Sequence, residues 1–99
     1  MLARVAHWEG AEANALEATA EEIRQRAAAE GGPPPGVPAK GLMLLEDPAG
    51  GRAITITLFE NEEDYREGDA TLDSMSPPSD GMGRRVGVDK YEVAVQLEA

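Results

Sequence analysis

The sequence predicts an α+β domain with the element order strand, helix, strand, strand, helix, strand. Three observations support this order. Four segments of strand length are rich in apolar residues, two longer segments combine good helix formers with an apolar stripe, and glycine and proline separate them. Two right-handed crossovers on one antiparallel sheet give the ferredoxin-like βαββαβ fold, with a four-stranded antiparallel sheet and two helices on one face. The 99 residues, 1–99, are expected to form a single domain.

The first half of the chain is expected to contain one strand and one long helix. Residues 2–8 predict the strand, which ends at Gly10. Residues 11–30 are rich in Ala and Glu, which favour helix, and their apolar residues recur at helical spacing. The stripe expected to face the sheet comprises Leu16, Ala20, Ile23 and Ala27. Gly31-Gly32 and the prolines after them stop the helix, so residues 31–39 are expected to form a loop.

A β-hairpin and a second helix are expected next. Residues 41–45 and 52–60 predict two strands, joined by the turn sequence Asp47-Pro48-Ala49-Gly50-Gly51. Asn61 is expected to cap the second helix, whose first turn is acidic. The inward stripe of this helix is predicted to comprise Tyr65, Gly68, Leu72 and Met75. Gly68 either lets the helix approach the sheet closely or leaves open space over the sheet.

The last strand is predicted to span residues 84–97, after a loop at residues 76–81. The apolar residues change register between Val88 and Tyr91. A β-bulge is therefore expected near Asp89-Lys90.

Residues 53–59 contain no charged side chain, although the chain has a formal net charge of −10. A strand with one face in water should alternate apolar with strongly polar residues, and this strand does not. Both helices lie on the same face of the sheet in this fold, so the other face needs a different cover. We expect that cover to be a second subunit, a ligand or both, which predicts a homodimer.

Composition excludes several classes of function. The chain has 9 Lys plus Arg against 19 Asp plus Glu, so its surface repels nucleic-acid phosphates and anionic lipid headgroups. No apolar run reaches the length of a membrane-spanning helix or resembles a secretory signal, so a cytoplasmic location is expected. The absence of Cys excludes disulfides and thiolate chemistry, and a single His predicts no transition-metal site.

Several segments resemble the dimeric α+β barrel superfamily, in particular its small antibiotic-biosynthesis-monooxygenase-like domains. The resemblance is carried by Ala3-Arg4-Val5, Pro35-Gly36, the stretch of residues 51–63 and Tyr91-Glu92-Val93. It implies a barrel made by two face-to-face sheets across a dimer, with a cavity between the sheet and the helices of each subunit. Members of this superfamily include cofactor-independent monooxygenases acting on aromatic polyketides, haem-degrading enzymes and lactone isomerases.

Two positions depart from the pattern of that superfamily. Phe59 stands at the junction of strand and helix, where the family commonly has Trp. Gly68 occupies the place of a helix histidine that many monooxygenase-like and haem-degrading members carry. These departures weigh against haem ligation and against oxygenation that depends on that histidine.

Three residues are candidates for catalysis: His7, Arg4 and Tyr65. His7 is the one group suited to act as a base at neutral pH. Arg4 is able to hold a carboxylate or enolate oxygen, or else to form an intersubunit or cross-strand ion pair. Tyr65 either donates a hydrogen bond to an oxyanion or buries its ring in the core, and the same holds for Tyr91. The ligand pocket is expected to draw on Trp8, Thr55, Thr57, Phe59 and Tyr91.

Neighbouring residues of a strand point to opposite faces of the sheet, so His7 and Trp8 cannot line the same cavity. The sequence leaves open which of the two registers of this strand faces the helices. It also leaves two hypotheses for function. The first is a cofactor-independent monooxygenase acting on a small aromatic or phenolic compound, and the second is a non-catalytic dimeric module for binding or accessory roles. A haem-binding protein is the less favoured third alternative.

Overall fold

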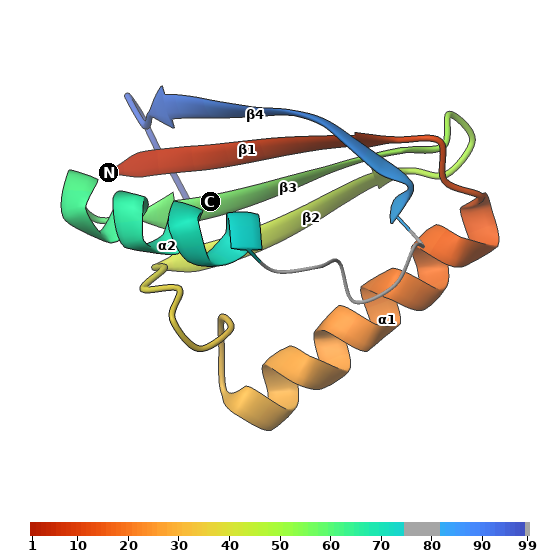
Figure 1. The fold of residues 1–99 in the computed structure, drawn as a ribbon, viewed down its shortest axis with the longest axis horizontal. Coiled ribbons are helices and arrows are strands. Elements are labelled where there is room, and N and C mark those ends of the chain that lie inside the picture. The colour runs from red at the N-terminus through yellow and green to blue at the C-terminus, as the bar shows by residue number, and fades with distance from the viewer. Residues whose placement is uncertain (75–81, 99) are drawn as a thin grey trace.

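A computed structural model describes residues 1–74 and 82–98 of the protein (Figure 1). Its elements, in chain order, are β1 (Leu2–Glu9), α1 (Ala13–Glu30), β2 (Gly41–Asp47), β3 (Arg52–Phe59), α2 (Glu62–Ser74) and β4 (Arg84–Glu92). The strands pair antiparallel in one sheet with the order β2-β3-β1-β4. The element order and the four-stranded antiparallel sheet predicted for a ferredoxin-like fold are therefore confirmed.

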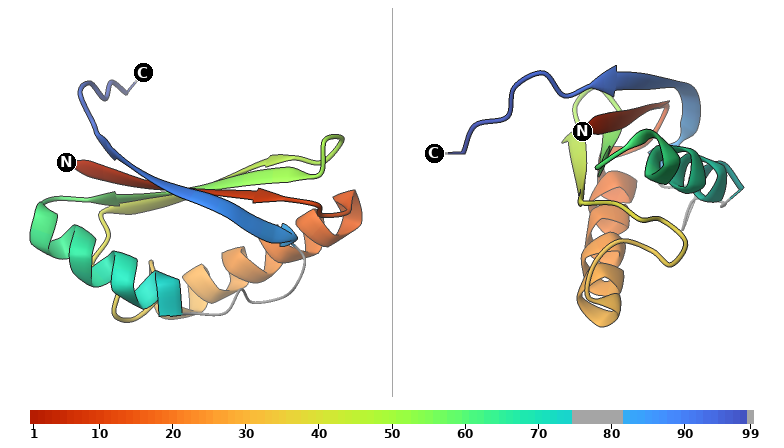
Figure 2. Two further views of the ribbon diagram at one scale, coloured as in Figure 1. Left: turned by 45° about the horizontal axis from the view of Figure 1, so that its top comes forward. Right: turned by 90° about the vertical axis from the view of Figure 1, so that its left-hand side faces the viewer.

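Both helices cover the same face of the sheet. In the left view of Figure 2, α1 and α2 lie beneath the strands, and the residues after β4 rise on the opposite side. Leu16 of α1 packs on Ala53, and Tyr65 of α2 packs on Phe59. We call the face that the helices cover the helix side, and the other face, which no described element covers, the open face.

The structure fixes the register of β1, which the sequence left open. Arg4 bonds to α2, and Trp8 packs beside Leu16 of α1, so both residues lie on the helix side. Since side chains alternate along a strand, Val5 and His7 lie on the open face.

Both faces of β3 are apolar, as the sequence indicates. Ala53 and Phe59 are buried under the helices, and Thr57, which shares their register, is 2% exposed. Ile54 and Ile56 point the other way and are half-buried. The ladders place further residues beside them, so that the open face comprises Ala3, Val5, His7, Met43, Leu45, Ile54, Ile56, Leu58, Asp89 and Tyr91.

Helix α1 buries its N-terminal half only. Leu16, Thr19 and Ala20 are buried, whereas Ile23 is half-buried and Ala27 is exposed. The predicted stripe is therefore wrong beyond Ile23, because the C-terminal half of α1 extends past the sheet (Figure 1). The helix ends where expected, at Gly31 with φ 77°, whose N–H donates to the Ala27 carbonyl at 2.8 Å. Within the described residues, no helix is both long and apolar enough to cross a membrane.

Helix α2 begins at the predicted cap, since the Asp64 N–H donates to Oδ1 of Asn61 at 2.9 Å. Tyr65 and Gly68 are buried on its inward side. A Cβ at Gly68 would overlap the ring of Phe59, so this glycine permits a close approach of helix and sheet rather than leaving open space. The expected inward Met75 and the expected loop at 76–81 lie outside the described residues.

Two details of the last strand differ from the prediction. Strand β4 ends at Glu92 rather than Leu97, because its partner β1 begins at Leu2 and offers no further residues for pairing. The β-bulge lies at Val86, where the register shifts opposite His7 and Trp8, rather than at Asp89-Lys90. The apolar residues Val88 and Tyr91 lie on opposite faces without a bulge between them, because both faces of the sheet hold apolar side chains.

Candidate functional site

The sheet separates the residues that the sequence singled out for function. The helix side holds Arg4, Trp8, Thr55, Thr57, Phe59 and Tyr65. The open face holds His7 and Tyr91. In one copy of the chain, His7 therefore cannot act on a molecule that Arg4 and Tyr65 hold, because a layer of backbone lies between them.

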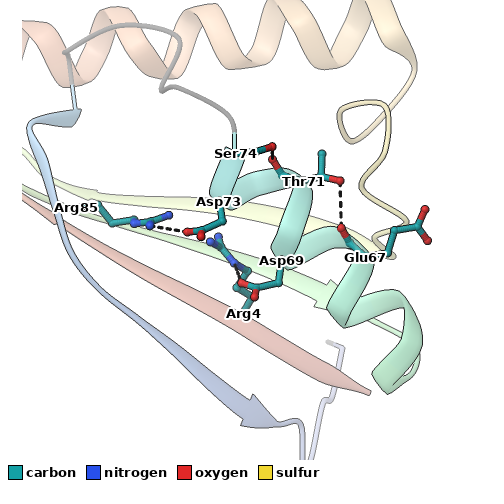
Figure 3. Close-up of polar contacts among 7 residues, drawn as sticks. All are labelled: Arg4, Glu67, Asp69, Thr71, Asp73, Ser74 and Arg85. Carbon is teal, nitrogen blue, oxygen red and sulfur yellow. Dashed lines mark hydrogen bonds and ion pairs between the residues drawn. The ribbon is translucent and has the colours of Figure 1, made fainter.

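Arg4 forms an ion pair between the sheet and α2. Its Nε donates to Oδ1 of Asp69 at 2.7 Å, and the residue is only 4% exposed (Figure 3). Its Nη2 is buried and has no hydrogen-bond partner within the described part of the chain. Arg4 therefore does form an ion pair, but it joins the sheet to α2 within one subunit rather than crossing to a neighbouring strand or a second subunit.

Two more ion pairs hold α2 against β4. Nη2 of Arg85 lies 2.6 Å from Oδ1 of Asp73, and Nζ of Lys90 lies 2.6 Å from Oε1 of Glu62 (Figure 3 shows the first pair). The hydrogen bonds from Lys90 lower the pKa of Glu62 below its ordinary value. Arg4, Arg85 and Lys90 thus each join the sheet to an acidic residue of α2.

Tyr65 behaves as a core residue. Its ring meets the ring of Phe59 edge-on, with the two centroids 5.5 Å apart. Nζ of Lys90 lies 4.8 Å from the centroid of the Tyr65 ring. Burial, and then the negative charge of Asp69, raise the pKa of Tyr65 above its ordinary value. The phenol therefore stays protonated at neutral pH and anchors α2 to the sheet.

His7 belongs to a different constellation, on the open face. Its Nε2 lies 3.0 Å from Oδ2 of Asp89 on β4, and both side chains remain partly exposed. An imidazole held by a carboxylate is the arrangement that orients a histidine for proton abstraction. The sequence pointed to His7 but missed Asp89, since a separation of 82 residues gives no local signal for the pairing.

An open cleft of about 290 Å³ lies beside His7. Ladder pairing aligns His7 with Ile54 and Leu45 across one row, and Glu9 with Arg52 and Asp47 across the next. Three further lining residues, Trp8, Glu46 and Ala53, belong to the helix side, so His7 and Trp8 do line the same cleft and the contrary expectation is wrong. Six of the nine lining residues lie on the open face, and the cleft combines an apolar floor with an imidazole and a charged end.

The charged end of the cleft is held in place by one ion pair. Nη2 of Arg52 lies 2.7 Å from Oδ2 of Asp47, and the Gly50 N–H donates to Oδ1 of the same carboxylate at 3.1 Å. The hydrogen bonds from Arg52, followed by the one from Gly50, lower the pKa of Asp47. Such a site suits a small molecule with an apolar body and one polar group directed at His7.

The rest of the described surface has fewer side chains suited to binding or catalysis. A larger hollow of about 520 Å³ is lined by two charged residues and two glycines: Glu9, Arg84, Gly10 and Gly83. Within residues 1–74 and 82–98, no three His, Asp or Glu side chains lie together as metal ligands would.

Comparison with protein-family models, with curated proteins and with solved structures found no match to this chain. The open face and the cleft beside His7 are therefore the features that bear on function.

Proposed function

We propose that the protein is a homodimer, joined through the open faces of its two sheets, that binds a small aromatic or phenolic molecule beside His7. The observation that carries this proposal is the open face itself. It is apolar, it is uncovered by either helix, and it contains the cleft in which a histidine is held by a carboxylate.

The homodimer is supported by the exposure of apolar side chains on this face. Met43 is 50% exposed, Leu45 is 45% exposed and Tyr91 is 56% exposed, and half-buried Val5 and Ile56 lie between them. Soluble monomers rarely expose a continuous apolar patch larger than a few hundred Å². Two such sheets packed face to face would exclude water from this patch, and the same face serves both partners as a two-fold interface requires.

A small, largely neutral aromatic ligand is supported by the size and charge of the cleft. Its volume of about 290 Å³ is at the lower end of small-molecule sites. Leu45 and Ile54 supply an apolar floor, and His7 is placed to accept the proton of a ligand hydroxyl. A net charge of −10 disfavours ligands that arrive as anions. A phenol fits this description.

A second candidate function, cofactor-independent monooxygenation, is favoured by the bond between His7 and Asp89 alone. In this reaction His7 would take the proton of a phenol, and the resulting electron-rich ring carbon would react with O₂. The substrate supplies the electrons: one oxygen atom becomes a carbonyl on the ring and the other leaves as water. Arg4 and Tyr65, on the other side of the sheet, take no part in this scheme.

The homodimer is tested by light scattering across a range of protein concentrations. The unaltered chain should have the mass of a dimer, and Ile56→Glu should have that of a folded monomer, because it places a carboxylate in the interface. Ala18→Glu adds the same charge on the exposed surface of α1 and should remain a dimer. A monomeric unaltered chain at high concentration, or a dimeric Ile56→Glu variant, would contradict the interface.

Binding is tested by ligand-observed NMR with a panel of anthrone-type and hydroquinone compounds, together with O₂ uptake. Loss of one hydrogen bond to His7 should weaken binding to His7→Gln by about tenfold. Binding without O₂ uptake supports a binding module. Uptake that His7→Gln abolishes and Asp89→Asn lowers supports the enzyme. If no compound of the panel binds, the assignment of the cleft to aromatic ligands fails.

A further inference from the structure

We infer that the two open faces join in a proton-linked manner, with the pair of His7 and Asp89 in each copy taking up a proton when the dimer forms. This inference rests on the homodimer proposed above. It adds a pH dependence that two purely apolar faces would not have.

The pair of His7 and Asp89 is the polar exception within an apolar surface. In the three rows of the open face that run from Ala3 to His7, the other side chains are apolar except for the phenol of Tyr91. Val5 lies directly opposite Asp89 on the ladder. A second copy that covers the apolar side chains of this face therefore also covers this pair.

The Asp89 carboxylate depends on His7 and on water. Its Oδ2 lies 3.0 Å from Nε2 of His7, and the two side chains are 54% and 37% exposed in one subunit. Among the residues that the structure describes, no other hydrogen bond or ion pair engages this carboxylate. Water thus solvates part of the charge, and a second copy on the open face would remove that water.

The other charged side chains around the pair do not supply a counter-charge. On the open face they lie in the row beyond His7, one from each strand, and alternate in sign: Asp47, Arg52, Glu9 and Arg84. Arg52 is already 2.7 Å from the Asp47 carboxylate, and Arg84 lies opposite Glu9. Lys90 follows Asp89 along β4, but it faces the helix side and pairs with Glu62. The counter-charge for a covered Asp89 must therefore come from His7.

The charge of the pair depends on one proton. A neutral imidazole leaves the pair with one net negative charge, whereas a protonated imidazole cancels that charge. Burying an uncompensated carboxylate costs far more than burying a paired one. The dimer should therefore bind up to one more proton per subunit than separated subunits do, so falling pH favours it and rising pH weakens it.

The composition of the chain makes this linkage accessible to experiment. His7 is the only histidine of the chain, and there is no cysteine. Histidine is the side chain that ordinarily titrates between about pH 5 and 8. A change in dimerisation across this range that depends on His7 can therefore be assigned to one imidazole.

The test measures the dissociation constant of the dimer by sedimentation at about pH 6 and about pH 8, at equal ionic strength and without ligand. We expect the constant of the unaltered chain to be at least about tenfold lower at the acidic pH. His7→Gln keeps a donor for Asp89 but takes up no proton in this range, so its constant should be the same at both pH values.

Asp89→Asn should reverse the sign of the effect. Without the carboxylate, a protonated His7 becomes the uncompensated charge, so this variant should dimerise more weakly at the acidic pH. Glu92→Gln is the matched control, because it removes an exposed carboxylate of β4 that lies in the helix-side register, opposite Leu2. This control should keep the pH response of the unaltered chain.

The NMR signal of the single imidazole reports the proton uptake directly. At about pH 7, raising the concentration of the unaltered chain should move this signal toward its protonated position. A dimer of equal strength at both pH values, or an Asp89→Asn variant that still tightens in acid, would overturn the proton linkage while the homodimer stands. An unaltered chain that is monomeric at both pH values would overturn both.

Discussion

The ion pair between Arg4 and Asp69 should respond very differently to the loss of each partner. The Arg4 side chain is 5% exposed, whereas the Asp69 side chain is 44% exposed, and their charged atoms are 2.7 Å apart. Asp69→Ala leaves a guanidinium in the core without its counter-charge, and water cannot reach it. Arg4→Met leaves a carboxylate that water already reaches. Asp69→Ala is therefore expected to be the more destabilising change.

The magnitudes follow from the two exposures. Removing one partner of a fully buried ion pair costs about 3–5 kcal/mol, and the partial exposure of Asp69 reduces this to about 2–3 kcal/mol for Asp69→Ala. Arg4→Met keeps an unbranched apolar stem and removes a buried Nη2 that lacks a partner within the described residues. Its cost is therefore expected to be about 1 kcal/mol or less. Helix propensity works against the predicted order, since Ala favours α2 more than Asp does.

The assay is urea unfolding followed by circular dichroism, with every variant at the same concentration because the proposed dimer would make the stability depend on concentration. With a slope of about 1 kcal/mol per M urea, the midpoint should fall by about 2 M in Asp69→Ala and by less than about 1 M in Arg4→Met. The double variant should resemble Arg4→Met, since the isolated charge is gone. Equal losses, or a larger loss in Arg4→Met, would refute the reasoning from burial.

Three further changes test other contacts. Gly68→Ala gains helix propensity but forces a methyl group into the fully buried ring of Phe59, so a net loss of about 1–2 kcal/mol is expected in urea unfolding. Because the pKa of Tyr65 is raised in the folded state, this residue contributes stability that is fully present below about pH 10 and is lost as the pH rises through the raised pKa. The free energy of unfolding should therefore fall less steeply with rising pH in Tyr65→Phe than in the unaltered chain. Because Arg52 lowers the pKa of Asp47 in the folded state, Asp47 contributes stability that is present above about pH 4 and is lost on acidification. The free energy of unfolding should therefore depend less on acidic pH in Asp47→Asn.

Each of these changes has a control or a contrary outcome. Glu67→Ala, at an exposed neighbour of Gly68 in α2, should leave the urea midpoint nearly unchanged. An unaltered midpoint in Gly68→Ala would show that the ring of Phe59 has room to move. An equal fall of stability with rising pH in Tyr65→Phe and in the unaltered chain would rule out a contribution from that phenol. An Asp47→Asn variant with the same acid midpoint as the unaltered chain would rule out a contribution from that carboxylate.

The parts of the fold that the sequence predicted correctly depend on neighbouring residues. Gly31 ends α1 because its left-handed backbone favours glycine, and Asn61 caps α2 through a bond to a residue three positions away. The uncharged run 53–59 likewise indicated a strand that is apolar on both faces. Each of these features depends on a few neighbouring residues, so it can be predicted without knowing the tertiary structure.

The parts that the sequence could not supply depend on long-range pairing. The face of β1 that carries Arg4 is decided by Asp69, which is 65 residues away, and the partner of His7 is 82 residues away. A register slip of one residue would exchange the two faces, so alternation alone cannot choose between them. The end of β4 was likewise set by its partner strand and not by its own sequence, which continues in the same pattern to Leu97.

Trp8 is an intrinsic fluorescent reporter of its surroundings on the helix side of the sheet. It is the single tryptophan, and its indole packs beside Leu16 and Met82, on the side of α1. Its emission should therefore shift when α1 undocks from the sheet. Trp8 also lines the cleft beside His7, so a molecule that enters this cleft should change the emission of the folded chain as well.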